Sequence, residues 1–454
     1  MSRAPFLTEI RDAIAARKLS AEDAVRDSLK RIAEHNGKLH AFVAIDEERA
    51  LEEARHQDRM AALGHPRAPL SGIAIGIKDL MDVAGFPTRA GSLTRQTVAP
   101  ATKDASVVAQ LKLQGAVVVG KTATVEYAFG GWGTNVTVGT PHNPWDMQNA
   151  RVPGGSSSGS GVAIAAGLIP AALGSDTGGS IRLPASFSGL VGLKTTVGLI
   201  DTTGVLPLTR ELDTIGPMAR SVLDAALIFD GMTGQHTSLA LQQLDSKRPL
   251  AALRIGLPKD LGVTLDPDTR KIYEATKVLL EEGGAQLIDL DLGKSIADFA
   301  APCGHFLAVE SYAHYGHFVD AEPSLIGEPV RQRMLGGKAM SAPDFLNQQF
   351  RRKLEVAAMA RVFESIDAIL LPATAMPAPR LDNYEEQSSP GVFTRLANYC
   401  DLAAIALPMG LSKEQLPIGM QIVVPAFHDA RALLIAHGLE TLNGGAILCP
   451  LHAA

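Results

Sequence analysis

Three segments of this 454-residue chain place small or reactive residues directly beside apolar stretches. Residues 154–161, GGSSSGSG, lead at once into the apolar run VAIAAGLIPAALG. A second glycine-rich stretch, GSDTGGSIRLPAS, follows at 174–186, and Lys78 ends the apolar run GIAIGIK. A flexible linker joins exposed ends, whereas this Gly/Ser segment enters a stretch that must be buried. We therefore expect the segment to be held firmly in the fold.

The second of these stretches has the composition of an anion-binding turn. Its residues Thr177, Gly178, Gly179 and Ser180 could direct consecutive backbone N–H groups into one concavity. Beside a hydroxyl nucleophile, such a turn would stabilise the oxyanion of an acyl-transfer reaction. Taken alone, it could also be an ordinary tight turn, and Lys78 could be a lysine whose amine reaches solvent. The three segments together favour catalysis.

Two other patterns indicate chemistry that we reject. Residues 115–122, GAVVVGKT, match the phosphate-binding pattern G-x-x-x-x-G-K-[ST]. Three of the four middle residues are β-branched valines and favour a strand, so we predict a strand over 116–120 and a helix from Thr122 instead of a nucleotide site. His314 and His317 share one helical face, but no third ligand and no H-E-x-x-H motif accompanies them. We expect neither a metal nor any other cofactor.

Residues 154–194, GGSSSGSGVAIAAGLIPAALGSDTGGSIRLPASFSGLVGLK, resemble the amidase signature family of serine hydrolases. The segments GIAIGIKDLMDVAG, GKTATVEYAFGGWGTNVTVGTPHNPWD, FTRLANYCDLAAIALP and LPIGMQIV are similar to other recurring segments of that family. The resemblance therefore covers most of the chain. It departs from the common pattern at Ser158, where many members carry glycine, and at LKTT, where LKPT is commoner.

The resemblance implies a Ser–Ser–Lys triad. Ser180 corresponds to the nucleophile, Ser156 to the bridging serine after a cis peptide bond, and Lys78 to the base. The backbone of Thr177, Gly178, Gly179 and Ser180 corresponds to the oxyanion hole. The resemblance places the substrate pocket in loops around 130–135, 300–340 and 375–415, and we name as substrate-binding candidates Gly131, Trp132 and Ser157.

The proposed base works only if its amine is neutral near pH 7, which burial without a close carboxylate would favour. Alternation along the strand should direct the side chain of Asp79 away from Lys78. Asp176 and Arg182 flank the nucleophile, and we predict that they form an ion pair that braces the turn.

The activity implied is hydrolysis of the C–N bond of a small carboxamide through an acyl-enzyme on Ser180, releasing ammonia or an amine. One alternative is the glutaminase (A) subunit of a tRNA-dependent amidotransferase. Another is a carboxybiuret- or allophanate-type ureido-amide hydrolase, and a non-catalytic scaffold is also open. We expect a homodimer with a small-molecule substrate and no nucleic-acid partner, unless the chain is an amidotransferase subunit.

These residues must be positioned by an α/β fold, because apolar strand-like runs alternate with helical patterns along the chain. We expect one large α/β/α domain over 1–454, whose mixed central sheet is covered by helices on both faces. Within it, 1–66 would form N-terminal helices, 67–235 the signature core, and 236–454 the variable pocket region and completing strands. The polar stretch 238–250 is a candidate surface connection.

Composition limits the remaining possibilities. A net charge of -6 argues against a nucleic-acid-binding surface. The first twenty residues scatter charges among apolar positions, which argues against a signal peptide or membrane span. Cys303, Cys400 and Cys449 are odd in number and widely spaced, which favours buried thiols and a cytoplasmic location.

Overall fold

The computed structural model describes residues 3–244 and 248–452. Its strands are β1 (Phe42–Ile45), β2 (Ala74–Lys78), β3 (Val117–Thr122), β4 (Ala171–Asp176), β5 (Val191–Lys194), β6 (Thr214–Ala219), β7 (Arg254–Pro258), β8 (Gln286–Leu290), β9 (Ala368–Pro372), β10 (Ala403–Leu411) and β11 (Pro417–Val424). They form one mixed sheet in the order β1-β3-β2-β4-β6-β5-β10-β11-β9-β7-β8. The mixed central sheet expected from the sequence is confirmed.

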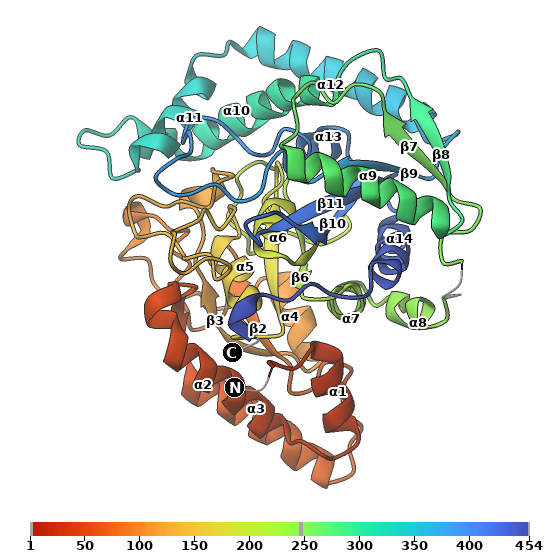
Figure 1. Ribbon diagram of the computed structural model, residues 1–454. Coiled ribbons are helices and arrows are strands. Elements are labelled where there is room, and N and C mark those ends of the chain that lie inside the picture. Colours follow the sequence, from red (N-terminus) through yellow and green to blue (C-terminus); the bar gives the residue numbers. More distant parts are fainter. Residues whose placement is uncertain (1–2, 245–247, 453–454) are drawn as a thin grey trace.

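The α-helices precede, connect and cover these strands (Figure 1). They are α1 (Leu7–Ala15), α2 (Ala21–Leu39), α3 (Glu47–Ala62), α4 (Ser106–Leu113), α5 (Ser158–Ala165), α6 (Arg182–Ser188), α7 (Val222–Thr233), α8 (Thr237–Gln242), α9 (Pro267–Glu282), α10 (Ala300–Val319), α11 (Glu328–Lys338), α12 (Ala342–Val362), α13 (Arg395–Tyr399) and α14 (Asp429–Leu442). Figure 1 shows α2 and α3 at the bottom of the molecule and α10, α11 and α12 at its top.

The sheet is buried on both faces because its apolar side chains alternate between two cores. On β2, Ala74 belongs to the core that includes residues of α2, α3, α5 and α6, whereas Ile75 faces the core that includes α7 and α14. On β4, Ala172 and Leu173 divide in the same way. Successive side chains of a strand point to opposite faces of the sheet. The short apolar runs of the sequence therefore form strands that helices cover on both faces.

The GAVVVGKT stretch is a strand, as predicted, but the helix expected from Thr122 does not form. Strand β3 extends through Lys121 and Thr122, which pair in parallel register with Ile77 and Lys78 of β2. The chain thus continues as a strand where the sequence suggested the start of a helix. The side chain of Lys121 is completely buried there, and its Nζ donates to Asp79 at 2.8 Å. A short 3-10 turn at Glu126–Ala128 follows instead.

Two other expectations concern single segments. The three cysteines are buried and unbonded, which confirms the expected thiols. The first part of the polar stretch 238–250 lies in α8, and residues 245–247 of that stretch lie outside the described residues.

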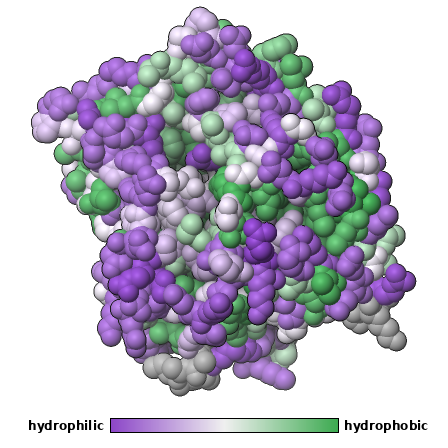
Figure 2. All heavy atoms as spheres, turned by 45° about the horizontal axis from the view of Figure 1, so that its top comes forward, coloured by the Kyte–Doolittle hydropathy of each residue, from purple (hydrophilic) through white to green (hydrophobic). Residues whose placement is uncertain are grey.

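Within the described residues, no helix combines the length and apolarity needed to cross a bilayer. Figure 2 shows hydrophilic and hydrophobic residues interspersed over the face that carries the top of Figure 1.

Candidate active site

The site is built where two parallel neighbouring strands end. Strands β2 and β4 pair in parallel through Ile77 and Leu173, so their carboxyl ends meet at one edge of the sheet. Lys78 is the last residue of β2, and its Nζ donates to Ser156 Oγ at 2.7 Å and to Ser175 Oγ at 2.8 Å. All three side chains are buried. A lysine amine between two hydroxyls, without a carboxylate in hydrogen-bond contact, is poised to exchange protons with them.

Burial determines the protonation of Lys78. Desolvation lowers its pKa from 10.5 to about 7, against smaller opposing effects of the carboxylates of Asp213 and Asp176. The neighbouring Asp79 points the other way, and its carboxylate accepts from Lys121 Nζ at 2.8 Å. The predicted alternation is therefore confirmed. Because Lys78 is buried and Asp79 does not pair with it, the pKa of its amine is about 7.

The Gly/Ser segment is fixed by backbone hydrogen bonds. The N–H of Gly154 donates to Trp132 O at 2.9 Å and that of Gly155 to Gly131 O at 2.8 Å. The peptide bond between Gly155 and Ser156 is cis. A Cβ on Gly155 would lie 2.7 Å from the oxygen of Gly130, so no larger residue fits there without displacing backbone. The segment is a packed part of the core, as expected.

Ser180 lies in the turn between β4 and α6, next to the Gly/Ser segment. The N–H of Ser157 donates to the carbonyl oxygen of Ser180 at 3.2 Å, which joins the two glycine-rich stretches. The Ser180 hydroxyl makes no hydrogen bond to any described residue. The structure thus links Lys78 to Ser156 directly, and a backbone hydrogen bond joins Ser180 to Ser157, the residue after Ser156.

The predicted ion pair of Asp176 and Arg182 is present and completely buried, with Nη2 and Oδ1 3.0 Å apart. The Arg182 guanidinium holds the pKa of the Asp176 carboxyl well below its usual range despite burial. Asp176 also accepts from Asn398 Nδ2 at 2.8 Å, while Arg182 Nη1 donates to the side chain of Gln421 at 2.9 Å. The pair ties the turn around Ser180 to α13 and β11.

Asp176 changes one expectation for the oxyanion hole. The N–H of Gly179 donates to Asp176 Oδ1 at 2.8 Å, so it is already engaged and does not face an empty site. The amides of Thr177, Gly178 and Ser180 have no hydrogen-bond partner among the described residues. These three amides are the donors that this turn leaves open.

A cavity of about 210 Å³ opens at Ser180. Of the three predicted substrate-binding residues, Gly131 lies in its wall. Trp132 is buried and is stacked on Phe187 with a centroid distance of 6.2 Å. Ser157 Oγ is 3.3 Å from both the N–H and the carbonyl oxygen of Ser175. Trp132 and Ser157 therefore do not line the cavity.

Sequence reasoning missed two polar groups beside the lysine. Ser175 is the second hydroxyl partner of Lys78, and its only signal was its place in GSDTGG at the end of an apolar run. Asp213 accepts from Thr177 Oγ1 at 2.5 Å, and burial raises its pKa to about 6. Nothing in the sequence near Asp213 marks it as part of this site. No cluster of His, Cys, Asp and Glu suited to a metal occurs in the described part of the chain.

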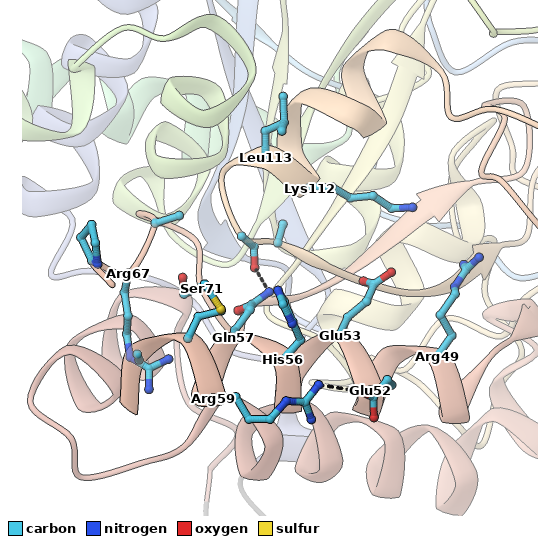
Figure 3. A pocket seen from close by; sticks show the side chains of 16 residues that line it. Arg49, Glu52, Glu53, His56, Gln57, Arg59, Arg67, Ser71, Lys112 and Leu113 are labelled. Carbon is cyan, nitrogen blue, oxygen red and sulfur yellow. Dashed lines mark hydrogen bonds and ion pairs between the residues drawn. The ribbon is translucent and has the colours of Figure 1, made fainter. Parts of the chain in front are cut away.

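A larger cavity of about 640 Å³ lies between α3 and the connection from α4 to β3 (Figure 3). Its wall is rich in charged side chains such as Glu52 and Arg59, which pair with each other at 2.7 Å. Gln57 crosses the cavity to donate to the carbonyl oxygen of Gly115 at 3.0 Å. None of the triad candidates lines it.

The chain is similar to known proteins over nearly its whole length. The Amidase family model matches residues 23–433. The A subunit of glutamyl-tRNA(Gln) amidotransferase from Coxiella burnetii is 35% identical, with 95% of this chain and 96% of that protein covered.

Solved structures share the fold at high structural similarity. One chain comes from a vestigial protein complex that bears on the evolutionary origins of an s-triazine catabolic enzyme. It has a TM-score of 0.90 and 29% identity, covering 98% of this chain and 100% of that one. The native peptide amidase of Stenotrophomonas maltophilia has a TM-score of 0.83 and 27% identity, covering 98% of each chain.

Proposed function

Because this chain belongs to the amidase family, we propose that it hydrolyses the C–N bond of a small carboxamide through an acyl-enzyme on Ser180. One observation carries the proposal. The largely desolvated amine of Lys78 lies 2.7 Å from Ser156 Oγ, in the segment that is hydrogen-bonded to the backbone of Ser180. A lysine whose pKa is about 7 can accept a proton at neutral pH, which an ordinary lysine cannot.

In the proposed reaction, Ser180 Oγ attacks the carbonyl carbon of the amide. Its proton passes to Ser156 Oγ as the Ser156 proton passes to the neutral Nζ of Lys78. The open amides of the turn stabilise the oxyanion. The tetrahedral intermediate then expels the amine, which takes a proton back through Ser156. Water attacks the resulting ester, and the same groups return the serine to its free form and release the acid.

The test is ammonia release from a panel of aliphatic, aryl, ureido and amino-acid amides by the purified protein and its Ser180→Ala variant. Loss of the nucleophile should reduce the rate by about 10⁴-fold or more, as in other serine hydrolases. Unchanged circular dichroism and unfolding midpoint would show that the fold persists. An active Ser180→Ala variant would overturn the mechanism.

A second candidate is the glutaminase subunit of a tRNA-dependent amidotransferase. The 35% identity to the A subunit of the Coxiella burnetii amidotransferase, over nearly the whole of both chains, favours it. In that function the chain would act with other subunits and pass ammonia onward. Efficient hydrolysis of another carboxamide by the purified chain, with little action on glutamine, would reject it. Glutamine hydrolysis that appears only with partner subunits would support it.

The structural similarity to a chain linked to s-triazine catabolism supports the third candidate, a hydrolase of ureido amides. The ureido members of the amide panel test it directly. The expected homodimer and cytoplasmic location remain proposals. Light scattering of the purified chain distinguishes a homodimer from a monomer, and a monomer would favour a function that needs other subunits.

A further inference from the structure

Arg395 is a positive charge in the cavity wall that no protein carboxylate balances. It lies at the start of α13 and lines the cavity together with Ser180. Its Nη1 donates to the backbone oxygen of Ala300 at 3.0 Å. Among the described residues it has no ion-pair partner within 4.0 Å, and its Nε and Nη2 have no acceptor.

The second arginine of the cavity is different. Arg333 Nη2 forms an ion pair with Glu386 at 2.7 Å, and its Nη1 donates to Phe129 O at 2.9 Å. Glu386 also accepts from Thr134 Oγ1 at 2.8 Å and Tyr384 Oη at 2.6 Å. Arg333 is therefore neutralised within the protein and fixes the cavity wall, while the charge of Arg395 stays available.

Arg395 lies close to Gly178, in the turn that carries Ser180. A Cβ on Gly178 would lie 3.8 Å from both Cγ and Nε of Arg395, so the arginine packs against the turn that carries Ser180. Burial lowers the pKa of Arg395, yet a guanidinium stays charged at neutral pH because its ordinary value is so high. Holding a cation in a desolvated site costs free energy unless an anion compensates it.

The remaining wall supplies no anion. Besides the two arginines it consists of glycine, apolar, hydroxyl and amide residues, such as Leu307, Ser388 and Gln387. None of the described residues that line the cavity is an aspartate or glutamate, so nothing there would pair with the ammonium group of a free amino acid.

We propose that Arg395 binds a carboxylate of the substrate, so that the enzyme prefers short anionic carboxamides or ureides to neutral or zwitterionic ones. This inference rests on the proposed amide hydrolysis at Ser180. Arginine suits the role because its planar fork donates two parallel hydrogen bonds to a carboxylate. The volume of about 210 Å³ restricts the substrate to a short chain. Glutamine would place its ammonium group among apolar atoms and a cation.

The first test uses two substrates of matched size, succinamate and its neutral diamide succinamide. The parent enzyme should show a kcat/KM for succinamate about 10- to 100-fold above that for succinamide. Arg395→Gln should remove this preference while retaining turnover of succinamide, and Arg395→Lys should retain part of it. Arg351→Gln, at an exposed position of α12, is the matched control and should behave like the parent.

A second measurement reads occupancy of the cavity instead of product formation, over times too short for succinamide to be consumed. A sulfonyl fluoride should label Ser180, and succinate should protect the serine at a lower concentration than succinamide does. Arg395→Gln should raise the protecting concentration of succinate by about 10-fold or more and leave that of succinamide unchanged. Equal protection by the two compounds in the parent, or an equal loss in the variant, would overturn the role of Arg395. Absence of labelling in the parent would overturn the proposed nucleophile itself.

Discussion

At the scale of single residues, the protonation of Lys78 decides when the site can work. Its amine contacts only the hydroxyls of Ser156 and Ser175 among the described residues, and burial moves its pKa from 10.5 to about 7. Below pH 7 the amine is protonated in most molecules and cannot accept the serine proton. Above pH 7 it is mostly neutral and can serve as the base.

We therefore predict that kcat/KM rises with pH and levels off above about 7. Steady-state rates between pH 5.5 and 9 measure this limb. The Asp213 carboxylate raises the pKa of Lys78, so Asp213→Asn should shift the limb to lower pH. A profile that is flat over this range, or a shift to higher pH in the variant, would show that another group limits the rate.

At the scale of elements, the Gly/Ser segment and the start of α5 carry four buried serines, and three of them, Ser156, Ser158 and Ser160, differ clearly in their surroundings. Ser156 Oγ contacts the amine of Lys78 at 2.7 Å. Ser160 Oγ lies 2.7 Å from Thr122 Oγ1 and donates to Leu173 O at 3.0 Å, so it ties the helix to β3 and β4. Ser158 Oγ is buried without a partner among the described residues. Only the first hydroxyl has a place in the proposed proton path.

We predict that Ser156→Ala lowers kcat by about 10²- to 10⁴-fold, because it removes the proton relay. Ser160→Ala should keep near-parental activity and lose about 1 kcal/mol of unfolding free energy with its hydrogen bonds. Ser158→Ala should keep activity and stability, since its hydroxyl has no bond to lose. Ammonia release and urea unfolding measure both quantities, and equal activity losses in all three variants would refute the ranking.

The same elements show what could be predicted from the sequence. Lys78, Ser156 and Ser180 lie in contiguous motifs that resemble the amidase signature family, so they could be named as a candidate triad from the sequence. The contact of Ser175 with Lys78 could not be predicted, because strand alternation alone does not show which face of β4 faces the lysine. The engagement of Gly179 by Asp176 depends on how the turn folds back on its own side chain. The helix predicted from Thr122 was wrong, because the pairing of Thr122 with β2 is a long-range contact that local sequence patterns do not show.

At the scale of the whole molecule, the cavity wall combines residues from distant parts of the chain. It includes Gly131, the turn around Gly178, Gly304 of α10 and Arg395 of α13. Arg395 could not be assigned from the sequence, because its effect depends on three-dimensional packing against that turn. Short motifs indicate the nucleophile and base, whereas specificity arises from contacts between segments that the sheet brings together.

The N-terminal segment is held to this assembly by one buried carboxylate. Asp224 of α7 accepts from the N–H groups of Leu7 and Thr8, each at 3.0 Å, at the start of α1. The apolar side chains of Leu7, Ile10 and Ile14 are buried in the core that includes α7. The start of α1 therefore depends on a contact with an element far along the chain.

We predict that Asp224→Ala lowers the unfolding free energy by about 1–3 kcal/mol, because it leaves buried N–H groups without an acceptor. Residues near α1 should become more accessible to limited proteolysis. The value of kcat/KM should change little, because Asp224 neither lines the cavity nor belongs to the proposed triad. Asp230→Ala is a matched comparison on the same helix, since Asp230 accepts from Thr237 and Ser238 at α8 instead. Faster cleavage near α1 in Asp230→Ala than in Asp224→Ala would show that Asp224 does not hold the N-terminal helix.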